Sequence, residues 1–217
     1  MIKYLIFDFD GTIADTTEGI LRTTEETLKR MGLPVCPDEQ VKRCIGLPLK
    51  GHLAAALIPE GRLDEAVDLY HELFYEVAPK HISIFDGVKE VLEECSRKGL
   101  QMAIATSRGE NSLKLLLKEH GIDRYFTVLG TVNCVERPKP NPDLVLWVLD
   151  RFNEVNGTAA SPEETLVIGD TTFDLQMGSS AGCRTCAVTY GNHTRQMLET
   201  ASPDFIVDNL RDLPALI

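Results

Sequence analysis

A short apolar run near the start of the chain ends in two carboxylates, and this pattern narrows the possible folds more than any other. Residues 4–7 read Tyr-Leu-Ile-Phe and predict a buried strand, which Asp8, Asp10 and Gly11 follow. Side chains alternate along an extended strand, so the two carboxylates point the same way if the strand continues. Acids at the carboxyl end of a buried parallel strand lie where open α/β sheets bind their ligands. Close carboxylates repel each other, so this pair needs a cation or a shared proton.

The composition argues against several classes of partner. The 217 residues carry a formal net charge of −11, and nucleic acids and anionic membranes bind basic surfaces instead. The apolar run at the start is too short for a signal peptide, and no stretch approaches a membrane span. We therefore expect a cytoplasmic protein with reduced cysteines that binds neither nucleic acid nor membrane. Cys183 and Cys186 have C-x-x-C spacing, but no second pair completes a zinc site.

Two different periodicities divide the chain. Residues 15–82 contain only helical patterns, which predict helices over residues 16–31, 37–46, 49–57 and 63–77. From about residue 83, predicted strands (101–105, 126–129, 165–168, 185–189, 205–207) alternate with predicted helices (86–98, 111–120, 142–152, 173–181, 193–200). Such alternation favours a doubly wound parallel sheet covered on both faces. The predicted fold class is therefore α/β, with a core of residues 1–14 and 83–217 and an all-helical insertion of residues 15–82.

Two further segments carry groups suited to binding an anion. Residues 102–107 form an apolar strand that ends in Thr106 and Ser107. Hydroxyls and turn amides there can donate to phosphate oxygens, although Thr106 can also end the strand by bonding its own backbone. Residues 137–142 read Arg-Pro-Lys-Pro-Asn-Pro and hold Lys139 in a stiff loop. An ammonium group in this position would keep carboxylates that it contacts ionised.

A second pair of acids follows a later strand. Residues 166–170 form an apolar strand that turns at Gly169 and ends in Asp170, and Asp174 lies four residues on. Carboxylate oxygens suit Mg²⁺, which usually binds few carboxylates together with water and substrate phosphate. Asp174 also lies where a helix N-terminus favours an acid, and the two interpretations are compatible.

Taken in this order, the four motifs resemble those of the haloacid dehalogenase superfamily in its phosphatase form. The resemblance covers the whole chain and implies a Rossmann-like core with a helical cap, residues 15–82, over the active site. It implies that Asp8 is a nucleophile forming an aspartyl-phosphate and that Asp10 is the acid and base. Thr106 and Lys139 would hold the phosphate oxygens. Mg²⁺ would bind Asp8, the Asp10 carbonyl and Asp170. Asp174 would lie next to these metal ligands and orient a water molecule or Lys139.

The resemblance also points to residues that would select the substrate. Residues 44–50 are similar to a cap loop of phosphoglycolate phosphatases and related pyrophosphatases, so Lys50 would meet a second anionic group. The alternative, to which we give equal weight, is that Lys50 is a solvated surface lysine with no contact to the substrate. Ser107 and Arg108 follow Thr106 and would join it in binding substrate. Arg22 and His52 are weaker candidates of the same kind.

The leading hypothesis is a Mg²⁺-dependent phosphatase for a small acidic metabolite, with phosphoglycolate as the first candidate. Its alternatives are a β-phosphoglucomutase-like phosphoryl transferase, a pyrophosphatase and a non-catalytic binding protein. Asp10 argues against a dehalogenase, which lacks this acid, and against a phosphonoacetaldehyde hydrolase, which carries a small residue there. A monomer suffices, since one chain supplies every residue of the site.

Overall fold

A parallel sheet forms the centre of the molecule in this computed structural model, which describes residues 1–157 and 160–217. Its strand order is β5-β4-β1-β6-β7-β8, and all neighbours are parallel. The observed order confirms the predicted doubly wound sheet. The strands are β1 (Tyr4–Phe7), β4 (Gln101–Ala105), β5 (Val128–Gly130), β6 (Thr165–Gly169), β7 (Arg184–Val188) and β8 (Phe205–Val207).

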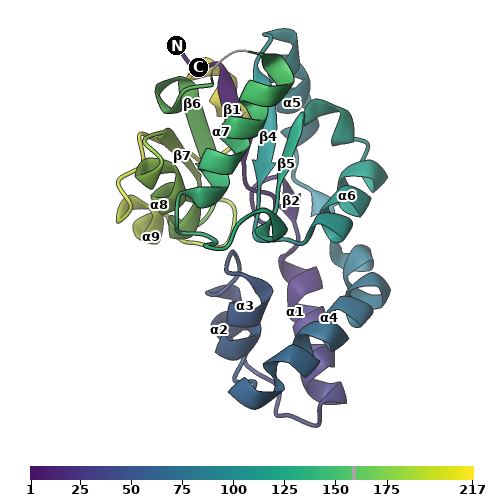
Figure 1. The fold of residues 1–217 in the computed structure, drawn as a ribbon. Helices are drawn as coiled ribbons and strands as arrows, with labels where there is room; N and C mark the ends of the chain where they lie inside the picture. Colours follow the sequence, from purple (N-terminus) through teal and green to yellow (C-terminus); the bar gives the residue numbers. More distant parts are fainter. Residues whose placement is uncertain (158–159) are drawn as a thin grey trace.

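Helices cover both faces of the sheet (Figure 1). Alternation along β1 sends Tyr4 and Ile6 to the face packed by α7 and α8, whereas Leu5 and Phe7 face α5 and α6. Both faces are apolar, which explains why β1 reads as a continuous apolar run. The α-helices of this part of the chain are α5 (Val88–Arg97), α6 (Glu110–Glu119), α7 (Asp143–Asn156), α8 (Thr172–Ser180) and the short α9 (Arg195–Glu199).

A separate group of helices lies beyond the carboxyl ends of the strands (Figure 1). Its members are α1 (Thr17–Arg30), α2 (Asp38–Lys42), α3 (Leu49–Ala55) and α4 (Leu63–Val77). The segments before and after this group pair antiparallel as β2 (Ala14–Asp15) and β3 (Ser83–Ile84). Neither strand was predicted, because two residues are too few to show an alternating pattern. The division into domains at residues 14/15 and 82/83 stays a prediction.

Short 3₁₀ segments and caps adjust several predicted boundaries. The last α-helix begins at Arg195 and not near His193, because the His193 amide donates to the Asp170 carbonyl and Thr194 caps the helix. The 3₁₀ segments are η1 (Glu60–Arg62), η2 (Ala78–His81), η3 (Asp123–Tyr125), η4 (Val132–Cys134), η5 (Pro162–Glu164) and η6 (Leu210–Ala215).

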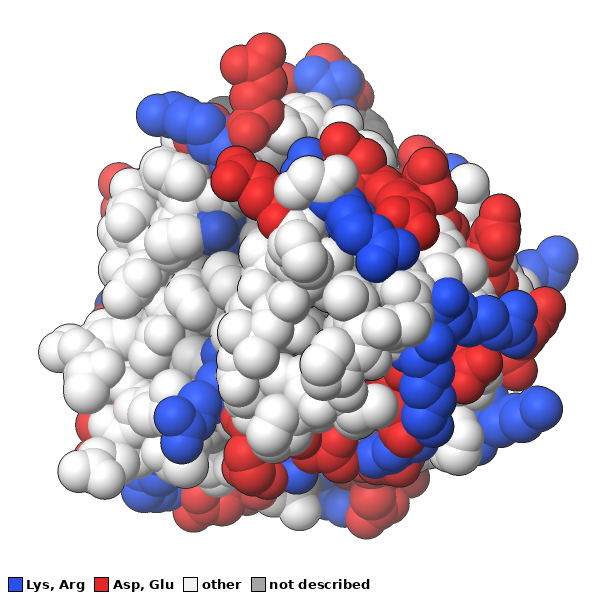
Figure 2. Space-filling model, turned by 90° about the horizontal axis from the view of Figure 1, so that it is seen from below, with Lys and Arg blue, Asp and Glu red and all other residues white. Residues whose placement is uncertain are grey.

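The surface carries both signs of charge on the face that the helical group presents. Figure 2 shows Lys and Arg interspersed with Asp and Glu around a broad uncharged area. Across the part of the chain that the structure describes, no helix has the length and apolarity needed to cross a membrane.

Candidate active site

Three neighbouring strands place the predicted acids and hydroxyl at one edge of the sheet. Asp8 and Asp10 follow β1, Thr106 follows β4 and Asp170 follows β6. Because β4 and β6 flank β1 in register, the carboxyl ends of the three strands lie together. All four side chains are buried. The structure thus brings together residues that lie up to 162 positions apart in the sequence.

Lys139 joins two of the predicted acids. Its Nζ donates to Asp8 Oδ1 over 2.7 Å and also donates to Asp174 Oδ1. The other oxygen of Asp174 accepts hydrogen bonds from the amide and hydroxyl of Thr171 at 3.0 and 2.6 Å. Asp174 therefore fixes Lys139 beside Asp8. Desolvation lowers the pKa of Lys139, but the charges of Asp174 and Asp8 and the hydrogen bonds to them outweigh it and leave this pKa raised.

Asp170 is held from two sides. Thr12 Oγ1 donates to its Oδ1 over 3.1 Å, and Oδ2 accepts from the amide and side-chain nitrogen of Asn192 at 2.7 and 2.8 Å. None of the partners that hold the acids, Thr12, Thr171 and Asn192, was predicted. Thr171 could have been found from its Thr-x-x-Asp capping-box spacing and Thr12 from its place just after Asp10. Asn192 lies in the loop after β7, the strand that pairs with β6, and no sequence motif marks it.

Gly11 allows Asp170 to approach the turn after β1. Its φ is +88°, and a Cβ at this position would lie 2.2 Å from Asp170 Oδ2. A side chain here would meet both backbone strain and a carboxylate that is itself held by three hydrogen bonds. The glycine in the first motif is thus required by packing around Asp170.

The carboxylate cluster fits a divalent cation. One oxygen each from Asp8, Asp170 and Asp174 lie within 4.8 Å of one another. Asp8 Oδ2 is buried and has no hydrogen-bond partner among the described residues. Burial raises the pKa of Asp8 well above its ordinary value, although the charge of Lys139 acts to lower it. Burial and the charge of Asp174 raise the pKa of Asp170 to about 7. A hard cation such as Mg²⁺ would stabilise these ionised oxygens.

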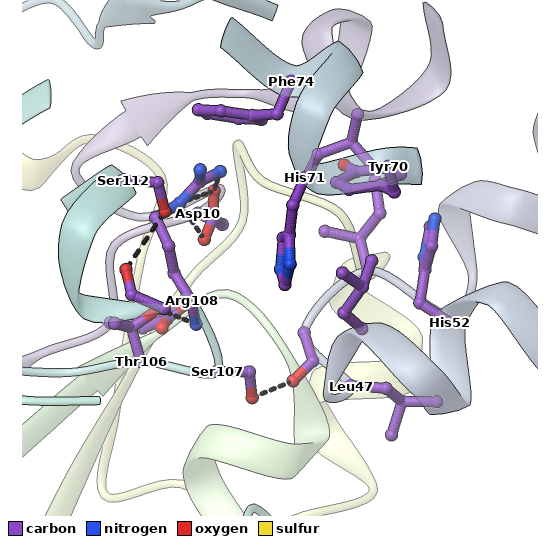
Figure 3. Close-up of a pocket in the computed structure, with 16 residues that line it drawn as sticks. Asp10, Leu47, His52, Tyr70, His71, Phe74, Thr106, Ser107, Arg108 and Ser112 are labelled. Atoms are coloured by element: carbon purple, nitrogen blue, oxygen red, sulfur yellow. Dashed lines mark hydrogen bonds and ion pairs between the residues drawn. The ribbon is translucent and has the colours of Figure 1, made fainter. Parts of the chain in front are cut away.

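A pocket of about 100 Å³ lies between this cluster and the helical group (Figure 3). The core contributes Asp8, Asp10 and Thr106, and the helical group, including the loop between α2 and α3, contributes mainly apolar side chains. These apolar residues are Ile20, Ile45, Leu47, Leu49 and Phe74. His71 and Tyr70 of α4 also face the pocket (Figure 3).

The predicted substrate-binding residues divide into two groups. Ser107 and Arg108 line the pocket: Ser107 Oγ donates to the Gly46 carbonyl over 2.7 Å, and the guanidinium of Arg108 forms an ion pair with Asp10. Lys50 lies outside the pocket lining and pairs with exposed Asp64 at 2.7 Å.

The two weaker candidates also differ. Arg22 is bound by acids on the outside of the helical group, among them Glu18 and Asp38. His52 lies in the pocket wall, where its Nε2 is 3.0 Å from Thr24 Oγ1. Burial lowers the pKa of His52 to about 4, so this imidazole is neutral at physiological pH. His52 therefore offers the pocket no positive charge.

The fold and the buried acids at the ends of its central strands define a family of hydrolases. The chain belongs to the haloacid dehalogenase-like hydrolase family, whose model matches residues 5–188. This finding confirms the resemblance inferred from the four motifs.

Curated relatives span nearly the whole chain. "Probable phosphatase IndB" from Dickeya dadantii is 34% identical, covering 98% of this chain and 92% of its own. "Pyrophosphatase PpaX" from Bacillus mycoides is 29% identical, with coverage of 98% and 95%. "Phosphoglycolate phosphatase" from Vibrio parahaemolyticus is 25% identical, with coverage of 98% and 94%. A haloacid dehalogenase-like family hydrolase from Streptococcus pneumoniae shares the fold, with a TM-score of 0.86, 24% identity and coverage of 99% and 98%.

Proposed function

We propose that this protein is a Mg²⁺-dependent phosphatase that hydrolyses a small phosphorylated metabolite, with a phosphoglycolate-like molecule as the leading substrate. The family and the relatives make the chain a hydrolase that acts on phosphoric monoester bonds. The observation that carries the mechanism is the asymmetry of Asp8: Lys139 binds Oδ1, whereas Oδ2 is buried without a partner among the described residues. A cytoplasmic location and a monomeric state remain predictions.

Asp8 is the proposed nucleophile. Its Oδ2 forms a bond to phosphorus as the bond between phosphorus and the ester oxygen breaks, which gives an aspartyl-phosphate. Asp10 gives a proton to the leaving oxygen and then takes one from the water that hydrolyses the intermediate. Lys139 fixes Asp8 during both steps through the 2.7 Å hydrogen bond.

Thr106 is suited to hold a transferring phosphate oxygen. Its Oγ1 accepts a hydrogen bond from the Arg108 amide at 3.1 Å, which leaves the hydroxyl proton free to donate. Mg²⁺ would bind to Asp8, Asp170 and the Asp10 carbonyl, and it would offset the repulsion between the carboxylate nucleophile and an anionic substrate. Asp174 serves this site through Lys139, because both of its oxygens are engaged by Lys139 and Thr171.

The pocket supports a small substrate. Its volume of about 100 Å³ is below the roughly 300–1,000 Å³ of clefts that hold drug-sized ligands. Phosphoglycolate has two carbons and a second anion, and the pocket presents Arg108 to such a group. Pyrophosphate is the second candidate, because a relative covering nearly the whole chain is named as a pyrophosphatase.

Phosphate release from a panel of substrates tests the proposal. The panel contains phosphoglycolate, pyrophosphate, hexose phosphates, nucleoside monophosphates, and β-glucose 1-phosphate with its bisphosphate activator. We expect release that requires Mg²⁺, stops with EDTA and is lost in Asp8→Asn, whereas Asp123→Asn, on the exposed surface, stays active. Release that persists in Asp8→Asn would contradict the nucleophile. Isomerised sugar with little free phosphate would favour the mutase.

A further inference from the structure

Arg108 forms an ion pair that occupies the proposed acid and base. Its Nε lies 3.0 Å from Asp10 Oδ2 and 3.2 Å from Oδ1, and its Nη2 also donates to Oδ1. Both side chains are close to fully buried, at 8% and 12% exposed. Each oxygen of Asp10 therefore already accepts a charge-assisted hydrogen bond, and these bonds compete with the contacts that Asp10 needs to a leaving oxygen or a water molecule.

The same guanidinium links the sheet to the helical group. Its central carbon lies 5.8 Å from the ring centre of Phe9, beside Asp10, and 5.0 Å from that of Phe74 in α4. Figure 3 shows the side chains of Arg108 and Asp10 next to each other at the edge of the pocket, with Phe74 above them. Contacts of a guanidinium with two aromatic faces hold the planar group in place and restrict how far it swings.

The charges around the pocket indicate what Arg108 binds. It is the one lysine or arginine among the described residues that line the pocket, whereas the helices offer apolar side chains and histidines. A second anionic group on the substrate therefore meets its cation on the sheet side, next to the reacting phosphate. The predicted alternative, Lys50, points away and pairs with Asp64.

We propose that Arg108 is the specificity residue for a phosphate monoester that carries a carboxylate, and that this carboxylate releases Asp10 by taking over the guanidinium. The inference rests on the proposed phosphatase function and deepens it. Without a second anion, Arg108 keeps Asp10 engaged and turnover is slow. With one, the fork of N–H donors moves from the carboxylate of Asp10 to that of the substrate, and Asp10 becomes free to transfer protons.

A matched pair of substrates tests this exchange. Phosphoglycolate and 2-hydroxyethyl phosphate both carry the phosphate on a two-carbon unit, but only the first has a carboxylate. We expect Arg108→Gln to lower kcat/KM for phosphoglycolate by about 10- to 100-fold, the loss expected for a hydrogen bond to a charged group. The neutral ester should keep or gain activity, because Asp10 is released. Arg108→Lys should fall between, since an ammonium lacks the bidentate fork.

A second experiment supplies the carboxylate separately from the substrate and starts from the wild-type enzyme. Sodium formate should accelerate hydrolysis of 2-hydroxyethyl phosphate in a saturable way, because formate supplies the missing carboxylate; sodium chloride at the same ionic strength should not. The activation should persist in Arg124→Gln, an exposed arginine, and be absent in Arg108→Gln.

The outcomes separate the two proposals. An equal loss for both substrates in Arg108→Gln, with an unchanged melting temperature, would show that Arg108 binds the transferring phosphate and would overturn the inference. If Arg108→Gln fails to fold, the formate experiment on the wild type decides. The inference is then overturned if formate does not activate the wild type. No phosphate release from any monoester by the wild type would instead overturn the proposed function.

Discussion

Replacing Lys139 by methionine removes the cation between two buried carboxylates while keeping a long side chain. Lys139 Nζ donates to Asp8 at 2.7 Å and to Asp174, and its side chain is 1% exposed. Removing one partner of a buried ion pair costs about 3–5 kcal/mol, because the remaining charge is left unpaired. In a chain of this size each 1 kcal/mol shifts Tm by about 2–4 °C. We therefore expect Lys139→Met to melt about 6–20 °C below the wild type in EDTA.

Calorimetry with and without Mg²⁺ checks this value and its cause. Mg²⁺ should recover part of the loss, because a divalent cation among the same carboxylates replaces some of the missing positive charge. Lys114→Met is the control: this exposed lysine pairs with Glu110 on the surface of α6 and should change stability by at most about 1 kcal/mol. A decrease of less than about 2 °C in Lys139→Met would refute the reasoning that the triad is held as ions.

Two further predictions concern the proposed metal site. Gly11→Ala should lower both Tm and Mg²⁺-dependent phosphate release, because its Cβ would lie 2.2 Å from Asp170 Oδ2 at a φ of +88°; normal values of both would contradict this packing. Mg²⁺ should raise Tm more at pH 8 than at pH 6, because burial raises the pKa of Asp170 to about 7 and only the ionised form binds metal. In EDTA, Tm should instead fall as pH rises, because the raised pKa of Asp170 stabilises the fold in acid and this stabilisation is lost as pH rises through about 7. Calorimetry of Asp170→Asn should show a smaller dependence of Tm on pH.

Sequence patterns predicted the sheet and the positions of the buried acids because both depend on local order. An apolar run followed by polar residues marks a strand and its carboxyl end, as for Asp8 after β1 and Asp170 after β6. A parallel sheet then brings strand ends together without further information. The register of β1 with its two neighbours was not needed to expect that these residues meet.

The pocket could not be predicted in the same way. Lys50 was expected to face the substrate, but α3 begins at Leu49 and turns Leu49 and His52 to the pocket, so Lys50, two residues before His52, lies on another side of the helix and is exposed. That outcome follows from helical spacing once the start of α3 is known. The pairing of Arg108 with Asp10 joins positions 98 residues apart, and no local pattern encodes such a side-chain contact.

The pairing of β2 with β3 has a consequence for how the sequence of this protein can change during evolution. Ala14 lies opposite Ile84 and Asp15 opposite Ser83, so the chain leaves the sheet and returns to it at adjacent points. Opposite residues in such a ladder lie only about 5 Å apart, a gap that a tight turn bridges. Among the described residues, the strands of the six-stranded sheet pair with one another and not with β2 or β3. We therefore expect the predicted insertion, residues 15–82, to be an exchangeable module, so that a different insert would alter the choice of substrate while the proposed catalytic residues stay in place.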